Sequence, residues 1–442
     1  MLRICCVFII ILFSIMIFGT TFSLTYQQNI LDNFYNSFQL EIWYKSNDFS
    51  FHTSLLFSND GKFPPFLAPF YGNYYVVLTD SGIRFSADNL KFSFGNLSNY
   101  DVIDSPYSLY FSSLGYAKPT ISMKYLDEKF EYETRYVLIS YDDGGNFVNK
   151  GMNFKYYAIK VGNFRIGYEE SVVYASRTYF DLEYFLNPVP NFFLQYVRES
   201  SFYKDGMFND NSLMGFFIDY KDMEKYWYVQ ILIDDFNANR IFNPENPTVD
   251  KVAWSLGFKK LLRRDLKIGL YHAGATKYTF QPSGNSGNQL LYGYTYYNET
   301  IFGDYVIDYQ ENYIGYKYGE NNLALLLNLL WTPGNFKLNS ELEFIISGTK
   351  SPVNPWTERD SYEPGFNLLN EDSLEKTMLF KIGIEKDFGI ITLGTKLLTG
   401  MIYNKLELVD AYDLVGKPYY APSSNNERLI DLKIFLKIKF NF

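Results

Sequence analysis

Cysteine is almost absent from this chain. Its only two cysteines, Cys5 and Cys6, lie in an N-terminal segment with the features of a secretory signal peptide: an early cation, an apolar run over residues 4–18 and a small-residue end. We predict that residues 1–23 are this signal peptide and that the mature chain starts at Leu24, with an uncleaved anchor as the alternative. A mature chain without cysteine has no disulfide, thiolate metal site or cysteine nucleophile.

Basic clusters and long apolar runs are also missing. The chain has 40 Lys and Arg against 49 Asp and Glu, a net charge of −9, and loss of Arg3 with the signal peptide gives 39 − 49 = −10. The charges are spread along the chain, so nucleic acid, whose binding needs clustered Lys and Arg, is not an expected partner. No stretch after the signal peptide approaches ~18 consecutive apolar residues, so membrane-spanning helices are excluded as well.

Aromatic residues, in contrast, are abundant. The 41 Tyr, 41 Phe and 5 Trp residues make up 20% of the chain, while its mean hydropathy is only −0.16. High aromatic content, modest hydropathy, secretion and a lack of cysteine are together typical of bacterial outer-membrane barrels. We therefore predict an all-β fold: a transmembrane antiparallel up-and-down β-barrel in the cell outer membrane, in contact with outer-membrane lipid.

The C-terminal strand has the clearest pattern. From Ile430 to Phe442 the even positions are all apolar, whereas the odd positions include Asp431 and Lys433. A long strand with one apolar and one charged face suits a tilted crossing of a bilayer. The aromatic end at Phe442 resembles the C-terminal signal by which the barrel-assembly machinery recognises outer-membrane proteins, so this machinery is an expected partner.

The same alternation recurs along the chain and predicts about 18 strands, within a range of about 16–22. The predicted strands are 107–115, 119–126, 129–141, 153–161, 164–173, 178–186, 191–199, 211–221, 225–234, 250–260, 264–274, 289–297, 304–318, 322–331, 335–348, 375–386, 389–403 and 428–442. Short connections alternate with long ones, as periplasmic turns and surface loops do in such barrels. We predict one domain, 24–442, in which residues 24–106 add strands to the barrel or form a plug or a periplasmic appendage.

Histidine is scarce as well, which limits acid–base and metal chemistry. Of the two histidines, His52 lies beside Ser50 and Ser54 on a polar strand face and is the one candidate base for a hydroxyl nucleophile. No local motif of a serine or cysteine hydrolase surrounds it. We predict a protein that is not an enzyme, with no catalytic residue, metal or cofactor, and keep an outer-membrane hydrolase as an alternative.

Aromatic clusters in the long connections are candidate sugar-binding surfaces, because sugar rings stack on the faces of Tyr and Trp. The candidates for glycan stacking are Tyr292, Tyr294, Tyr296, Trp356 and Tyr362. Outer-membrane barrels also carry aromatic girdles at both membrane interfaces regardless of any ligand, so girdle or loop packing is the alternative interpretation.

One block of motifs is more distinctive than its composition. It runs through Gly167 to Tyr174, Tyr184 to Pro190, Asn209 to Gly215 and Gln230 to Phe236. This block resembles the central region of the capsule-assembly Wzi-type family of outer-membrane barrels. The resemblance implies an eighteen-stranded barrel that helps to attach or organise surface polysaccharide. The matching positions, expected to have structural roles first and glycan or cation contact second, are Glu169, Asn187, Asp210, Asn211, Asp234 and Asp235.

The leading functional hypothesis is therefore a non-catalytic barrel that binds or organises cell-surface polysaccharide. A general diffusion porin is the main alternative, and the net charge of −10 would then favour cations. An open lumen would indicate the porin, whereas a lumen plugged by protein would indicate the polysaccharide-organising barrel.

Overall fold

The computed structural model describes residues 20–441 with the exception of 32–33, 64–67, 113–116, 142–148, 176–180, 200–209, 236–248, 282–292, 297–300, 303–304, 307, 352–362 and 410–418. Most of the described residues belong to the strands of one barrel wall. In chain order these are β1 (Thr20–Asn29), β2 (Tyr35–Lys45), β3 (Phe49–Ser58), β5 (Tyr74–Leu78), β6 (Ser81–Ala87), β7 (Leu90–Ser98), β8 (Ala117–Leu126), β9 (Phe130–Ser140), β10 (Lys150–Val161), β11 (Phe164–Ala175), β12 (Asn211–Lys221), β13 (Lys225–Asp235), β14 (Val249–Arg263), β15 (Leu266–Ala275), β18 (Asn322–Trp331), β19 (Phe336–Ser347), β21 (Glu375–Asp387), β22 (Ile391–Tyr403) and β25 (Glu427–Asn441).

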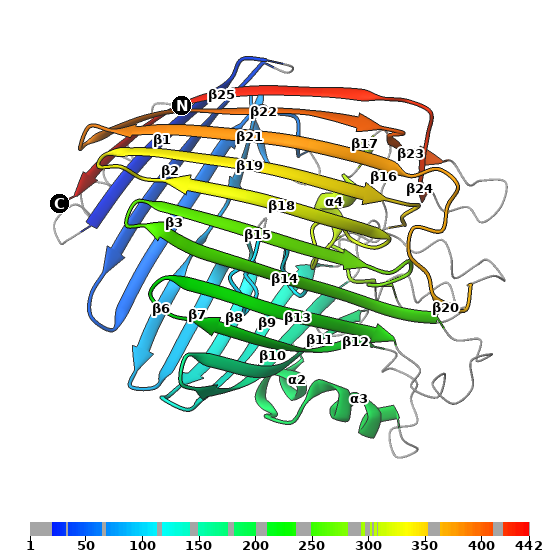
Figure 1. The fold of residues 1–442 in the computed structure, drawn as a ribbon. Helices are drawn as coiled ribbons and strands as arrows, with labels where there is room; N and C mark the ends of the chain where they lie inside the picture. Colours follow the sequence, from blue (N-terminus) through cyan, green and yellow to red (C-terminus); the bar gives the residue numbers. More distant parts are fainter. Residues whose placement is uncertain are drawn as a thin grey trace.

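These strands form a closed antiparallel barrel of 18 strands (Figure 1). Each strand pairs with the next one along the chain, and β5 and β6 act as a single bent strand because both pair with β3. The first and last strands close the wall, with Leu24 of β1 opposite Ile438 of β25. Closure leaves no unpaired sheet edge, which is what a barrel in a bilayer requires.

The remaining elements are short and lie in the connections. They are β4 (Phe70–Tyr71), α2 (Leu182–Leu186), α3 (Asn191–Glu199), β16 (Ile301–Phe302), β17 (Tyr305–Val306), α4 (Tyr309–Asn312), β20 (Gly365–Phe366), β23 (Leu406–Val409) and β24 (Tyr419–Pro422). None of the described helices is long and apolar enough to cross a membrane.

The two faces of the wall differ in polarity over most of its strands. On β18 and β19, for example, Leu325 lies opposite Phe344 on the outside, and these side chains remain 39% and 38% exposed. The intervening residues of β19, Glu341 and Glu343, point into the barrel and pair there with lysines. This arrangement fits a wall with an apolar solvent outside and water or protein inside.

The two ends of the barrel differ in the length of their connections. At one end, here called the turn end, the connections have two to four residues: 46–48, 88–89, 127–129, 162–163, 222–224, 264–265, 332–335 and 388–390. At the other, the loop end, they are mostly much longer: 30–34, 59–73, 99–116, 141–149, 176–210, 236–248, 276–321, 348–374 and 404–426. Both ends of the barrel-forming chain, the start of β1 and the end of β25, lie at the turn end (Figure 1).

The predicted number of strands is confirmed, but some of the predicted positions are wrong. Predicted strands at 178–186 and 191–199 are replaced, in their described parts, by the helices α2 and α3. None of the predicted strands at 107–115, 289–297 and 304–318 forms a wall strand in its described part. Residues 107–112, 293–296 and 313–318 lie in the barrel interior, whereas 304–312 contains β17 and α4. The missing wall strands come from residues 20–98, and β1 begins at Thr20, four residues before the predicted mature start at Leu24.

Candidate functional site: a plug in the barrel lumen

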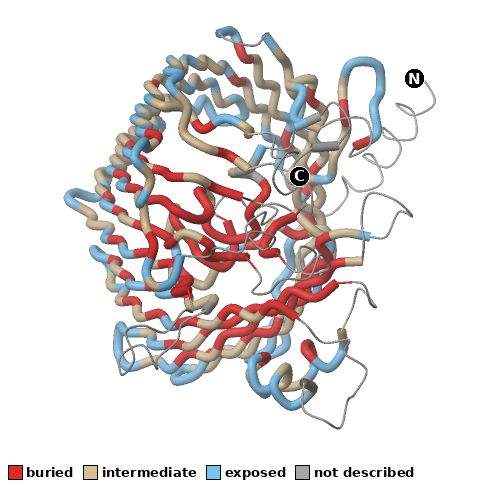
Figure 2. Tube along the Cα trace, turned by 90° about the vertical axis from the view of Figure 1, so that its right-hand side faces the viewer, coloured by how far each residue is buried: buried red, intermediate tan, exposed pale blue. Residues whose placement is uncertain are grey.

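Two connections of the loop end fold into the lumen. They are residues 99–112, between β7 and β8, and the buried parts of the connection between β15 and β18, which are residues 276–281, 293–296 and 312–321. Viewed from the loop end, their buried chain fills the centre of the barrel (Figure 2). We call these two segments the plug. Its position decides which parts of the lumen a solute can reach.

Segment 99–112 crosses the lumen and bonds to wall strands on different sides of it. The Tyr107 hydroxyl donates to Glu343 Oε1 of β19 at 2.8 Å, whereas the Arg135 guanidinium of β9 donates to the carbonyl oxygen of Tyr100 at 2.8 Å. Strand β9 and strand β19 are separated by seven wall strands along the chain, so they lie far apart around the barrel. The segment is therefore a crossbar rather than a lining of one wall.

A buried carboxylate organises the centre of this crossbar. Asp101 Oδ2 accepts the backbone N–H of Tyr110 at 2.8 Å and the side-chain amide of Gln230, on β13, at 3.2 Å. The same amide nitrogen donates to Glu169 Oε1, on β11, at 2.7 Å. Burial raises the pKa of Asp101, and its backbone donors oppose this rise. One glutamine thus joins two carboxylates and fixes the crossbar to the wall.

The second segment packs on the first through tyrosines. The Tyr294 hydroxyl donates to the carbonyl oxygen of Tyr110 at 2.6 Å, and the backbone N–H of Ser112 donates to Ile314 O at 2.8 Å. Several of the largest fully buried side chains of the described chain belong to this contact: Tyr107, Tyr110, Tyr294, Tyr313 and Tyr316. Burial of these large rings stabilises the plug by removing apolar surface from water, and the Tyr294 hydroxyl connects its two segments.

Lysines at the loop end hold the plug by its main chain. Lys150 Nζ donates to the carbonyl oxygens of Gly293 and Thr295 at 2.6 and 2.7 Å, and Lys251 Nζ donates to Gln281 O at 2.6 Å. Lys350 Nζ, just beyond β19, donates to Tyr318 O at 2.5 Å, and burial lowers its pKa to about 8. Because these ammonium groups bind carbonyl oxygens, they fix the main chain of the plug whatever side chains it carries.

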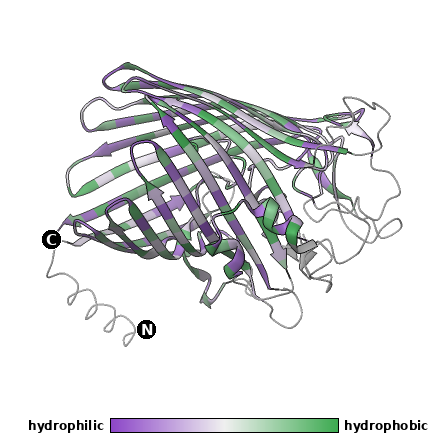
Figure 3. Ribbon diagram, turned by 90° about the horizontal axis from the view of Figure 1, so that it is seen from below, coloured by the Kyte–Doolittle hydropathy of each residue, from purple (hydrophilic) through white to green (hydrophobic). Residues whose placement is uncertain are grey.

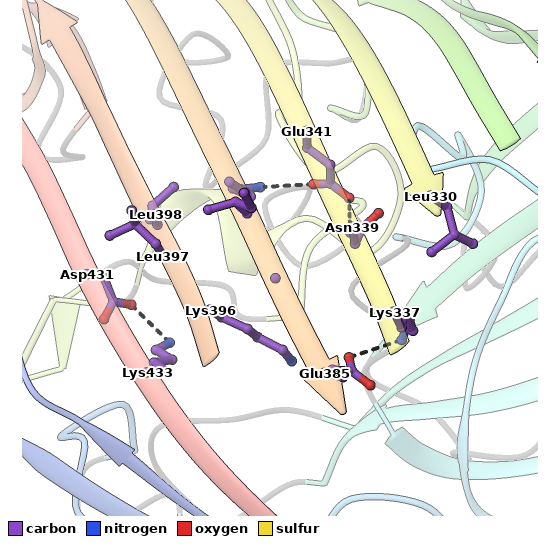
Figure 4. A pocket seen from close by; sticks show the side chains of 13 residues that line it. Leu330, Lys337, Asn339, Glu341, Glu385, Lys396, Leu397, Leu398, Asp431 and Lys433 are labelled. Atoms are coloured by element: carbon purple, nitrogen blue, oxygen red, sulfur yellow. Dashed lines mark hydrogen bonds and ion pairs between the residues drawn. The ribbon is translucent and has the colours of Figure 1, made fainter. Parts of the chain in front are cut away.

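The turn end of the lumen is different, because two of the cavities that the described residues form open there. One, of about 560 Å³, lies against β19, β21, β22 and β25, and its side chains are shown in Figure 4. The other, of about 400 Å³, lies against β12 to β15 and β18 and includes Asp104 of the plug. Leu330 lines both cavities. Lys259 Nζ lies 2.6 Å from Asp104 Oδ1, so this ion pair links wall and plug at the second cavity.

Lysines outnumber carboxylates in both cavities. The first has four against three, namely Lys337, Lys381, Lys396 and Lys433 against Glu341, Glu385 and Asp431; the second has five against three, namely Lys221, Lys225, Lys259, Lys260 and Lys267 against Asp104, Asp222 and Glu224. For the porin alternative, the net charge of the chain predicts a preference for cations. The cavities do not support that preference, because their lysines exceed their carboxylates by one and by two, which favours anions.

The residues of the predicted family motif do not form one site. Glu169 is buried in the lumen beside the plug, but Asn187 and Asp210 belong to the helical segment on the outside of the wall. The remaining three lie at the loop end of the wall: Asn211 begins β12, and Asp234 and Asp235 end β13. Glu169 is joined to the plug through the side chain of Gln230, and the other five residues lie elsewhere, so their positions do not support one ligand shared by all six.

The predicted aromatic residues divide into two groups. Tyr294 and Tyr296 are buried in the plug, with 0% and 5% of their surface exposed, so their rings pack on protein rather than on a loop surface. Tyr292, Trp356 and Tyr362 lie outside the described residues.

The sequence did not single out Tyr107, Tyr110 or Glu343 for the plug. The length of the 276–321 connection was the available signal, because a long structureless loop in a compact domain is unusual.

His52 is buried in the barrel wall beneath partly exposed side chains. Its Nε2 lies 2.8 Å from Asp80 Oδ1, its Nδ1 lies 3.0 Å from Arg84 Nη1, and its ring stacks on Trp43 with centroids 4.5 Å apart. Both ring nitrogens thus face charged side chains rather than a serine hydroxyl.

Within the described residues, no group of three or more His, Cys, Asp or Glu side chains is placed to hold a metal ion.

Solved structures with a similar fold are outer-membrane barrels. The chain resembles Wzi of Escherichia coli, described as an outer-membrane protein involved in group 1 capsule assembly and a carbohydrate-binding β-barrel, with 11% identity and a TM-score of 0.57 over 96% of this chain and 85% of that one. It also matches OccAB4 of Acinetobacter baumannii, with 10% identity and a TM-score of 0.44 over 96% and 97% of the two chains. No protein-family model matches the chain, and no curated protein matches it in sequence. The likeness to Wzi shows that the chain has the fold of an outer-membrane barrel.

Proposed function

We propose that this protein is an integral outer-membrane barrel that binds or organises cell-surface polysaccharide without catalysing a reaction. The observation that carries the proposal is the plug, whose residues cross the lumen and bond to wall strands far apart around the barrel. A barrel whose loop end is filled by packed tyrosines is better suited to hold loops in place than to pass solutes. The likeness to Wzi, itself described as carbohydrate-binding, supports the same function.

The proposed ligand surface lies on the loops that the plug supports. Trp356 and Tyr362 belong to the connection between β19 and β21, and this connection is tied to the plug by Lys350. Aromatic faces stack on sugar rings, and a fixed loop base lowers the entropy that binding must overcome. The buried Tyr294 and Tyr296 would then support the binding loops rather than contact the glycan.

A diffusion porin is the second candidate, and the two lysine-lined cavities favour it. These cavities would form the turn-end half of a path for anions. The plug opposes this function, because a solute would have to displace buried tyrosines and the hydrogen bonds that hold them. Catalysis is not part of either proposal, since His52 faces Asp80 and Arg84 in the wall.

Binding of purified surface polysaccharide from the producing cells tests the proposal. Detergent-purified protein is titrated with this polysaccharide, and we expect Trp356→Ala combined with Tyr362→Ala to weaken binding by roughly tenfold, the size typical for loss of aromatic anchors. Trp43→Ala, inside the barrel, is the matched control and should leave binding unchanged. A failure of the unmodified protein to bind, together with unchanged surface polysaccharide in cells that lack the gene, would contradict the proposal.

Insertion by the barrel-assembly machinery is the expected route to the membrane. Strand β25 carries the required alternation, and Phe440 faces Phe22 of β1 across the closing seam. Replacing Phe440 and removing Phe442 should reduce the amount of protein in the outer-membrane fraction of cells. An unchanged amount would argue against recognition through this strand.

A further inference from the structure

The helices α2 and α3 lie on the outside of the barrel, against the wall formed by β9 to β12 (Figures 1 and 3). They belong to the 176–210 connection of the loop end. Unlike the plug, this part of a long connection turns away from the lumen. The outer face of a barrel wall normally contacts lipid, so a polar surface loop would not be expected there.

The wall beneath the helices is polar on its outer face. Register alternation places Thr134, Asn153, Lys155 and Glu170 on the same outward face as Ile166. All four residues of this polar patch are less than 2% exposed. A charged side chain on the lipid face of a barrel destabilises it strongly near the membrane midplane.

The helical segment satisfies these wall groups with its own main chain. Lys155 Nζ donates to the carbonyl oxygens of Asn187 and Val189 at 2.7 and 2.8 Å, just after α2 ends. Glu170 Oε1 accepts the backbone N–H of Asn191 at 2.6 Å, where α3 begins. A cation near a helix C-terminus and an anion at a helix N-terminus are both favourable positions for charge. The patch and the segment therefore complement each other in charge.

The segment presents large apolar side chains on its other face. The side chains that are exposed by 41% to 69% are Leu182, Leu186, Val189, Phe192, Phe193, Tyr196 and Val197. Towards the turn end, the bare wall below continues this apolar surface with Ile159, Val161, Ile166 and Phe216, which are exposed by 53% to 61%. The described helices thus extend the apolar belt of the wall across a region where the wall itself is polar.

We propose that residues 182–197 form a lipid-contacting cover, in which α2 and α3 lie in the acyl-chain layer of the outer leaflet. This inference rests on the proposed outer-membrane location. The apolar face of the cover is continuous with the apolar belt of the wall. Because the belt contacts lipid, we expect the cover to contact lipid as well. An amphipathic helix with its apolar face towards acyl chains is a stable arrangement at a membrane interface. The role of the cover is to shield the polar patch from hydrocarbon.

Site-directed labelling in lipid vesicles tests this cover. Cys5 and Cys6 are the only native cysteines, so after their replacement by serine a single introduced cysteine carries one environment-sensitive fluorophore. Labels at Phe193 and Tyr196 are compared with a label at Ile166 on the bare belt and one at Asp222 in a short turn. Quenching is measured with bromine-labelled phospholipid and with aqueous iodide.

We expect the labels at Phe193 and Tyr196 to be quenched by bromine-labelled lipid to an extent similar to that at Ile166, and to resist iodide. Quenching by iodide as strong as at Asp222 would overturn the proposal. Resistance to both quenchers would indicate a protein contact, such as a second copy of the chain, and would also overturn it. If the label at Ile166 is not quenched by lipid either, the outer-membrane location itself fails.

A second pair of variants tests the role of the polar patch. Glu170→Gln removes the charge that accepts from the start of α3, and the label at Tyr196 should then lose part of its lipid quenching and become accessible to iodide. Glu128→Gln, in a short turn, is the matched control. Unchanged quenching at Tyr196 in Glu170→Gln would contradict the charge-complementarity argument.

Discussion

The two halves of the lumen show how one barrel wall can serve different purposes. At the loop end the interior is filled by buried tyrosines and by main chain bound to lysines, whereas at the turn end it holds two cavities lined by lysines and carboxylates. The wall strands are continuous through both halves, so the difference comes from the connections. Long connections at one end can fold inward, and tight turns at the other cannot.

Replacing the crossbar should have the largest effect on this difference. We expect a variant with residues 101–112 replaced by an equally long Gly-Ser segment to form ion-conducting steps in planar bilayers, because the crossbar hydrogen bonds and Tyr107 and Tyr110 are lost. A heat-modifiable shift on electrophoresis verifies that the barrel is still closed. A closed barrel without conductance would show that segment 276–321 fills the lumen alone.

Glu343→Gln should cause the next largest effect, a loss of stability at the junction of wall and plug. Glu343 is 1% exposed, accepts from Tyr107 at 2.8 Å and lies 2.8 Å from Lys317 Nζ. Removing one partner of a buried ion pair typically costs about 3–5 kcal/mol of unfolding free energy. Urea unfolding in detergent measures this cost. Glu341→Gln, whose carboxylate is partly exposed, is the control and should cost less than about 1 kcal/mol.

Two glycines with nearly equal backbone angles sharpen the comparison further. Gly319 in the plug has φ +62°, and an added Cβ would overlap the ring of Tyr313; Gly334 in a turn has φ +59° and open space around it. We expect Gly334→Ala to cost about 1 kcal/mol from backbone conformation alone, and Gly319→Ala to cost more because of the overlap. Equal effects in urea unfolding would mean that the plug is loosely packed.

Changing the charge of the turn-end cavities should have the smallest effect. We expect it to alter the ion preference of the variant that lacks the crossbar. Lysine-lined walls favour anions, so replacing Lys267 and Lys396 with glutamate should shift the reversal potential towards cation preference. Lys386→Glu, on the outward face of β21, is the control and should leave the potential unchanged. A preference for cations in the crossbar-deficient variant with its lysines intact would contradict the conclusion that the cavity charges favour anions.

The wall could be predicted from the sequence because its residues meet two different surroundings in alternation. In β19 and β25 every second residue faces outward, and the apolar pattern at Leu342 and Ile434 follows directly from that geometry. The plug could not be predicted in this way. Tyr294 and Tyr296 alternate with a polar residue as in a strand, and so do Tyr316 and Tyr318. These tyrosines are nevertheless buried inside the lumen, which only the tertiary structure reveals.

The outer helices escaped prediction for a related reason. Phe192, Phe193 and Tyr196 have the composition of a strand, and a strand was expected over 191–199. Their spacing also fits one face of a helix, and Pro190 directly before α3 favours a helix start. The strand predicted over 164–173 already places the family-motif residue Glu169 and its neighbour Glu170 on opposite faces of the wall. The sequence gave no indication that Glu170 lies beneath a helix.

The conductance of the unmodified protein in planar bilayers tests the central claim most directly, because it reports whether the packed segments close the lumen. The buried tyrosines and the lysines bound to plug carbonyls predict a barrel that inserts without sustained conductance steps. Large, steady steps from the purified, unmodified chain would contradict the account and would favour the porin function.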